Sequence, residues 1–84
     1  MIYVIDSIRE KSGKPHEREG RRKGHRVEIT DVSLGIPLVA RYIDEDTAYL
    51  QTSKVEAYNA EWETSNHLTV QTRNSVYTFR KEAI

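Results

Sequence analysis

Lysine and arginine side chains offer the most distinctive chemistry in this sequence, because eight of them fall within residues 9–26. Guanidinium and ammonium groups neutralise phosphates and carboxylates, so such a cluster predicts contact with a polyanion. Three glutamates in the same segment leave it a net charge of 8 − 3 = +5. Gly20 and Gly24 flank its densest part and would let the backbone approach a phosphate closely. The predicted contact residues are Arg18, Arg21, Arg22, Lys23 and Arg26.

This basic segment, residues 9–26, leaves the kind of partner open. The rest of the chain carries a charge of 5 − 10 = −5, so the protein is not a generic polycation. The segment has no aromatic residue to stack on a base, which favours contact with nucleic-acid phosphates without sequence specificity. The first alternative is a protein-binding inhibitor or accessory factor that contacts an acidic protein surface. The second is a solvated loop without a partner.

Histidines and carboxylates elsewhere show no pattern typical of a metal centre. His16, His25 and His67 do not have the spacing of metal ligands, and the chain has no cysteine to complete a set. The adjacent acidic residues 44–46 do not follow the spacing of a calcium-binding loop, and we expect them to form a solvated turn. We therefore predict neither a metal site nor a cofactor.

No catalytic constellation is visible either. Asp6 and Glu28 fall on neighbouring predicted strands, where pairing with Arg41 or Arg80 across the sheet is the ordinary expectation. The spacing of serines, histidines and aspartates supports no catalytic triad, and the glycines form no phosphate-binding loop. We expect a non-enzymatic binding module without a small-molecule substrate.

Length and composition predict one small domain in the cytoplasm. A chain of 84 residues has room for a single core. The absence of cysteine fits a reducing compartment, and no apolar stretch approaches the length that a bilayer requires. Residues 1–5 lack the basic start and cleavage site of a signal peptide. The thin core expected of this size also makes a homodimer an open possibility.

Short runs of alternating apolar residues predict a mostly-β domain of five to seven strands, arranged as a small barrel or a strongly bent antiparallel sheet. In the first strand, Ile2, Val4 and Ile8 are expected on one face. Turns are expected at Gly35 and at residues 73–75. The predicted strands cover residues 2–8, 25–32, 38–43, 48–52, 68–72 and 76–80.

Two segments are less regular. Residues 10–24 contain no apolar side chain, so we expect a long basic loop or a mobile hairpin tip. Residues 53–62 fit both a strand, which we favour, and one short helix that would begin with a capping box. Among the aromatic residues, Trp62 and Tyr77 are expected in the core and Tyr58 at the surface.

A resemblance emerges in the C-terminal half. The pattern consists of Thr52-Ser53-x-Val55 followed by Leu68-Thr69-Val70-x-Thr72-x-Asn74-Ser75-x-Tyr77-x-Phe79. It resembles small uncharacterised proteins of bacterial phages and mobile elements. The resemblance implies a strand–turn–strand structure and an origin of that kind, but no site residues. The long loop after the first strand also resembles SH3-like small barrels, which is an analogy of fold alone.

Overall fold

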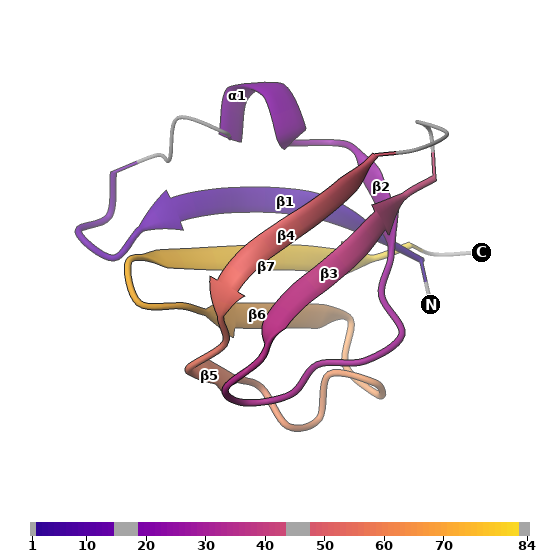
Figure 1. The fold of residues 1–84 in the computed structure, drawn as a ribbon. Helices are drawn as coiled ribbons and strands as arrows, with labels where there is room; N and C mark the ends of the chain where they lie inside the picture. The colour runs from indigo at the N-terminus through magenta and orange to yellow at the C-terminus, as the bar shows by residue number, and fades with distance from the viewer. Residues whose placement is uncertain (1, 15–18, 44–47, 83–84) are drawn as a thin grey trace.

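The structure is a computed structural model that describes residues 2–14, 19–43 and 48–82 (Figure 1). These parts of the chain form seven antiparallel strands and a single helical turn, which confirms the predicted mostly-β fold class. The elements in order are β1 (Ile2–Glu10), α1 (Glu19–Arg22), β2 (Arg26–Glu28), β3 (Pro37–Tyr42), β4 (Tyr49–Lys54), β5 (Ala57–Tyr58), β6 (His67–Gln71) and β7 (Ser75–Lys81).

The sheet curves like a barrel because its two end strands are neighbours in sequence. The spatial order is β4-β3-β2-β1-β7-β6-β5, and only Val55 and Glu56 separate β4 from β5. The Val55 N–H donates to the Ile36 carbonyl at 3.1 Å, whereas the Glu56 N–H donates to the Gln71 carbonyl at 2.7 Å. Consecutive residues thus bond to opposite ends of the sheet. In Figure 1, β3 and β4 cross over β1, β7 and β6 as a result.

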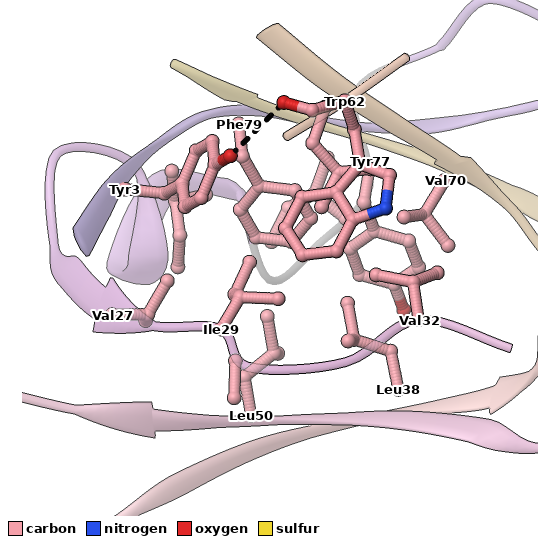
Figure 2. Packing of buried hydrophobic residues seen from close by; sticks show 14 of the residues in the cluster. Tyr3, Val27, Ile29, Val32, Leu38, Leu50, Trp62, Val70, Tyr77 and Phe79 are labelled. Atoms are coloured by element: carbon pink, nitrogen blue, oxygen red, sulfur yellow. Dashed lines mark hydrogen bonds between the residues drawn. The ribbon is translucent and has the colours of Figure 1, made fainter. Parts of the chain in front are cut away.

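One hydrophobic core fills the inside of this curve. Figure 2 shows Val27, Ile29, Leu38 and Leu50 on one side of the core, opposite the rings of Tyr3, Trp62, Tyr77 and Phe79. Val27 of β2 points inward, together with Leu38, Ala40 and Tyr42 of β3. Leu68 pairs with Phe79 and Val70 with Tyr77 across the β6–β7 hairpin, whose turn was expected at residues 73–75. Trp62 and Tyr77 are buried as predicted. Tyr58 is half-buried against the core, and the exposed tyrosine is Tyr49 instead.

The prediction for the faces of β1 is wrong. Tyr3, Ile5 and Ile8 point into the core, rather than Ile2, Val4 and Ile8. The pairing of β1 with β7 shifts register between Ile5 and Ser7, which is a β-bulge. One extra residue at the bulge moves Ile8 onto the same face as Tyr3 and Ile5.

The structure also tests the predictions for the two less regular segments, residues 10–24 and 53–62. Residues 53–62 complete β4, form the short β5 and then turn, so the alternative of a helix is wrong and the favoured strand is present only at 53–54 and 57–58. The helical turn that the chain does form, α1, lies in residues 10–24, where we expected a loop. The turn before β7 forms through a hydrogen bond from the Thr72 N–H to the Ser75 carbonyl at 2.9 Å. Gly35 adopts a φ of 79°, as its predicted turn requires.

Candidate nucleic-acid interface

The C-terminal part of the basic segment continues beside β1 beyond the residues that β2 pairs with, and backbone hydrogen bonds attach it there. β2 faces only Ile2 to Val4. Beyond it, the Ile5 N–H donates to the His25 carbonyl at 2.9 Å, and the Gly24 N–H donates to the Ile5 carbonyl at 2.8 Å. Gly24 has a φ of 90°, a conformation that glycine adopts without steric cost.

Glu19, at the start of α1, continues this attachment with its side chain. Its Oε2 accepts a hydrogen bond from the Ile8 N–H at 3.0 Å and lies 3.5 Å from the Arg9 Nε. The Glu19 side chain is only 12% exposed, whereas that of Arg9 is 46% exposed. The Glu19 side chain therefore holds the segment against β1, and its negative charge offsets the positive charge of Arg9.

Arg22 is held against the protein rather than directed to solvent. Its guanidinium carbon lies 5.1 Å from the centroid of the Tyr42 ring, on which it stacks as a cation–π pair. The His25 ring packs edge-on against the same tyrosine, with 5.5 Å between centroids. Tyr42 is fully buried at the end of β3. This predicted phosphate contact therefore has a packing role that the sequence did not reveal.

The other predicted contacts differ in how the structure presents them. Lys23 is exposed, and it forms no ion pair within the described residues. Arg26 Nη2 lies 2.9 Å from Glu82 Oε2, with the two side chains 44% and 30% exposed. An ion pair this exposed contributes little stability and exchanges readily with other anions. Arg18 and the side chain of Arg21 lie outside what the structure describes.

Two residues outside the predicted set share a face with Arg26. Val4 lies opposite Arg26 in β2 and opposite Arg80 in β7, and Arg80 in turn lies opposite His67 in β6. Directly opposed residues of antiparallel strands point to the same face, which here is the outer one. Arg26, Arg80 and His67 therefore form a row of basic side chains from β2, β7 and β6, with Val4 of β1 between the first two. We call these three residues the cationic row.

A hollow lies at the β6–β7 end of the cationic row. It is open to solvent, has a volume of about 500 Å³, and is lined by Asn66, His67, Arg80, Lys81 and Glu82. The Lys81 ammonium donates to the Glu63 carbonyl at 3.2 Å, and Glu82 pairs with Arg26. Arg80 is exposed and forms no ion pair with a described residue.

Two other cations of the described surface pair with carboxylates. Arg41 Nη2 lies 3.0 Å from Glu28 Oε1 in the adjacent strand, which confirms the expected cross-strand pair. Lys11 pairs with Glu56 at 3.1 Å, which occupies another cation of the basic segment. Among the predicted contacts and the row, Lys23 and Arg80 are exposed cations without an ion pair to a described residue, whereas Arg26 is exposed but paired with Glu82. In the sequence, only the outward position of Arg80 in the predicted strand 76–80, and that of His67 directly before the predicted strand 68–72, could have indicated these residues.

Within the described residues, no three histidine or acidic side chains gather at a potential metal site. His16 and the acidic residues 44–46 lie outside those residues, so the expectations about them stay predictions. No helix in the described parts of the chain has the length and apolar character needed to cross a membrane.

Comparison with known proteins identifies no relative: no family model, no curated protein and no solved structure matches this chain. The resemblance to phage and mobile-element proteins and the analogy to SH3-like barrels therefore gain no support and stay predictions.

Proposed function

We propose that this protein is a non-catalytic binding module that contacts the phosphates of a nucleic acid without sequence specificity. The observation that carries the proposal is the cross-strand register of Arg26, Val4, Arg80 and His67. Neighbouring strands lie about 4.8 Å apart, so the α-carbons of Arg26 and Arg80 are separated by roughly 10 Å. That spacing lets two guanidinium groups contact different phosphates of one strand.

The contact surface in this proposal includes only part of the basic segment, and it also includes residues outside that segment. Lys23 and Arg26 represent the segment, and Arg80 and His67 belong to the sheet. Arg9, Lys11 and Arg22 serve mainly to hold the loop in place. Apart from the His67 ring, the strands of the row carry no exposed aromatic side chain among the described residues, in keeping with backbone contact.

The experiment is a titration of a fluorescently labelled single-stranded oligonucleotide, followed by anisotropy at several salt concentrations. Each phosphate contact contributes a slope of about 0.7 to the dependence of log K on log salt. We expect Arg80→Gln to weaken binding severalfold and to lower that slope, with Arg26→Gln and Lys23→Gln behaving alike. Lys54→Gln is the matched control, because it removes an exposed cation of β4 that lies away from the row.

Absence of binding by the wild type at low salt would overturn the proposal. Equal losses for Lys54→Gln and Arg80→Gln would also contradict it, because they would show a dependence on total charge rather than on this surface. A duplex and an RNA oligonucleotide of the same length establish which nucleic acid is preferred.

A further inference from the structure

The hollow beside the cationic row differs in shape from the rest of the candidate interface. The row crosses the outer face of a sheet, whereas the hollow is a concave site of about 500 Å³ where β6 begins and β7 ends (Figure 1). Sites that bind small ligands have volumes of about 300–1,000 Å³. Arg80 and His67 belong to both features, so a group bound in the hollow is continuous with the row.

Hydrogen bonds fix the backbone around the hollow. The Lys81 N–H donates to the Asn66 carbonyl at 2.8 Å, which joins the end of β7 to the residue before β6. The His67 N–H donates to Ser65 Oγ at 3.2 Å, and the His67 carbonyl accepts from Asn59 Nδ2 at 2.9 Å. The site is therefore formed before a ligand arrives, which lowers the entropic cost of binding.

Several hydrogen-bond donors of the lining have no partner in the described part of the chain. The side chains of Asn66, His67 and Arg80 are exposed and form no hydrogen bond or ion pair with a described residue. The Lys81 ammonium, which has three donors, uses one of them on the Glu63 carbonyl. An amide, an imidazole, a guanidinium and an ammonium thus line one hollow, so donors border a bound ligand on more than one side.

The charge of the hollow favours a dianion. Arg80 and Lys81 contribute two positive charges, and the carboxylate of the lining, Glu82, is paired with Arg26 at 2.9 Å. These four side chains together have a net charge of 3 − 1 = +2. A phosphodiester inside a nucleic-acid strand carries one negative charge. A terminal phosphate group carries about −1.5 to −2 at pH 7 and has three acceptor oxygens.

We propose that the hollow binds the terminal phosphate of a nucleic-acid strand, while the row contacts the phosphates that follow. This inference rests on the proposed function, because the row is what holds the rest of the strand. Arg80 and Lys81 balance the charge of the terminal group, and Asn66 and His67 donate to its oxygens. An internal phosphodiester has less charge and one fewer free oxygen, so it uses fewer of these donors.

Anisotropy titrations with labelled single-stranded oligonucleotides of one sequence test this site at a fixed salt concentration. We expect a strand with a phosphorylated end, at its 5′ or its 3′ terminus, to bind at least about tenfold more tightly than one with two hydroxyl ends. A hydroxyl-ended strand that is one nucleotide longer controls for added charge, and it should gain less than about twofold. A nucleoside monophosphate, titrated as a competitor, should bind at least about tenfold more weakly than the phosphorylated strand, since it does not reach the row.

Asn66→Asp tests the position of the site, because it places a carboxylate in the hollow and leaves the row unchanged. It should remove most of the preference for a phosphorylated end and lower the affinity for hydroxyl-ended strands by less than about twofold. Asn74→Asp is the matched control, because it makes the same change at an exposed residue of the turn at the other end of the β6–β7 hairpin. If Asn66→Asp does not fold by circular dichroism, Asn66→Ala replaces it.

Equal affinities for phosphorylated and hydroxyl ends would overturn the terminal site and leave the proposed function intact. A failure of every strand to bind at low salt would overturn the proposed function itself, and the terminal site with it. A preference that persists in the Asn66 variants would contradict the assignment to this hollow. A mononucleotide that competes as tightly as the phosphorylated strand would show that the hollow binds a free phosphate ester rather than a strand end.

Discussion

The carboxylate of Glu19 accepts a hydrogen bond at 3.0 Å from the backbone N–H of Ile8, a residue of β1. β2 pairs only with Ile2 to Val4, so at Ile8 the side chain takes the place of a missing strand. Asn59 has a similar role beside the two-residue β5: its amide nitrogen donates to the His67 carbonyl at 2.9 Å, and its oxygen accepts from the Thr69 N–H at 2.8 Å. Two polar side chains thus complete hydrogen bonding where strands are short.

Replacing Glu19 with alanine should destabilise the protein, because it leaves the half-buried Ile8 N–H without its acceptor. The expected decrease in the free energy of unfolding is about 1–3 kcal/mol, measured by urea denaturation. Hydrogen exchange of the Ile8 amide should accelerate in the same variant. Glu10→Ala, which removes an exposed glutamate of the same segment, is the control and should change stability by less than about 0.5 kcal/mol. Equal stability of the two variants would show that Glu19 does not anchor the segment.

The elements that could be predicted from the sequence are those whose apolar residues alternate regularly. β3, β6 and β7 follow this rule, and they match the predicted strands 38–43, 68–72 and 76–80 to within one residue at each end. β1 does not, because the bulge between Ile5 and Ser7 inserts a residue that alternation cannot reveal. α1 has no apolar face at all. It forms where Glu19 and Arg22 find partners on β1 and β3, and those contacts exist only once the sheet has folded.

Arg22 and Lys23 are adjacent, yet the structure gives them different roles, which can be separated by mutation. Arg22→Ala removes the cation–π contact with Tyr42 and should lower the free energy of unfolding by about 0.5–1 kcal/mol, measured by urea denaturation. Lys23→Ala should leave stability within about 0.5 kcal/mol, because the side chain is exposed. Under the proposed function, oligonucleotide affinity should respond in the opposite order, with the larger loss for Lys23→Ala. A larger loss of affinity for Arg22→Ala would contradict this division of roles.

The candidate interface was only partly accessible to sequence reasoning, for a physical reason. Counting charges along the chain located the basic segment, but it could not show which cations have carboxylate partners. Arg9 pairs with Glu19, 10 residues away, and Lys11 pairs with Glu56, 45 residues away. Nor could it bring Arg80 beside Arg26, since that proximity depends on both strands pairing with Val4. Long-range register, rather than local composition, determines which cations share a face.

Alkaline pH should destabilise the protein through Tyr3. Its hydroxyl donates to the Trp62 carbonyl at 3.3 Å, and its ring packs 6.2 Å from the indole in the core (Figure 2). Burial, and then the negative charge of Glu63, raise the pKa of Tyr3 above its ordinary value of 10.0. The unfolded chain therefore loses this proton at a lower pH than the folded protein. The contribution of Tyr3 is fully present below about pH 10 and decreases as the pH rises toward the folded-state pKa.

Urea denaturation between about pH 7 and pH 11 measures this effect, since that range spans the ordinary tyrosine pKa. Tyr3→Phe loses the hydrogen bond to Trp62, so it should be less stable than the wild type at neutral pH by about 0.5–1.5 kcal/mol. It has no hydroxyl to ionise, however, so its stability should decline less steeply above pH 10. Tyr49→Phe, at an exposed position, should keep the steep decline of the wild type. Parallel declines for Tyr3→Phe and the wild type would show that another group controls alkaline unfolding.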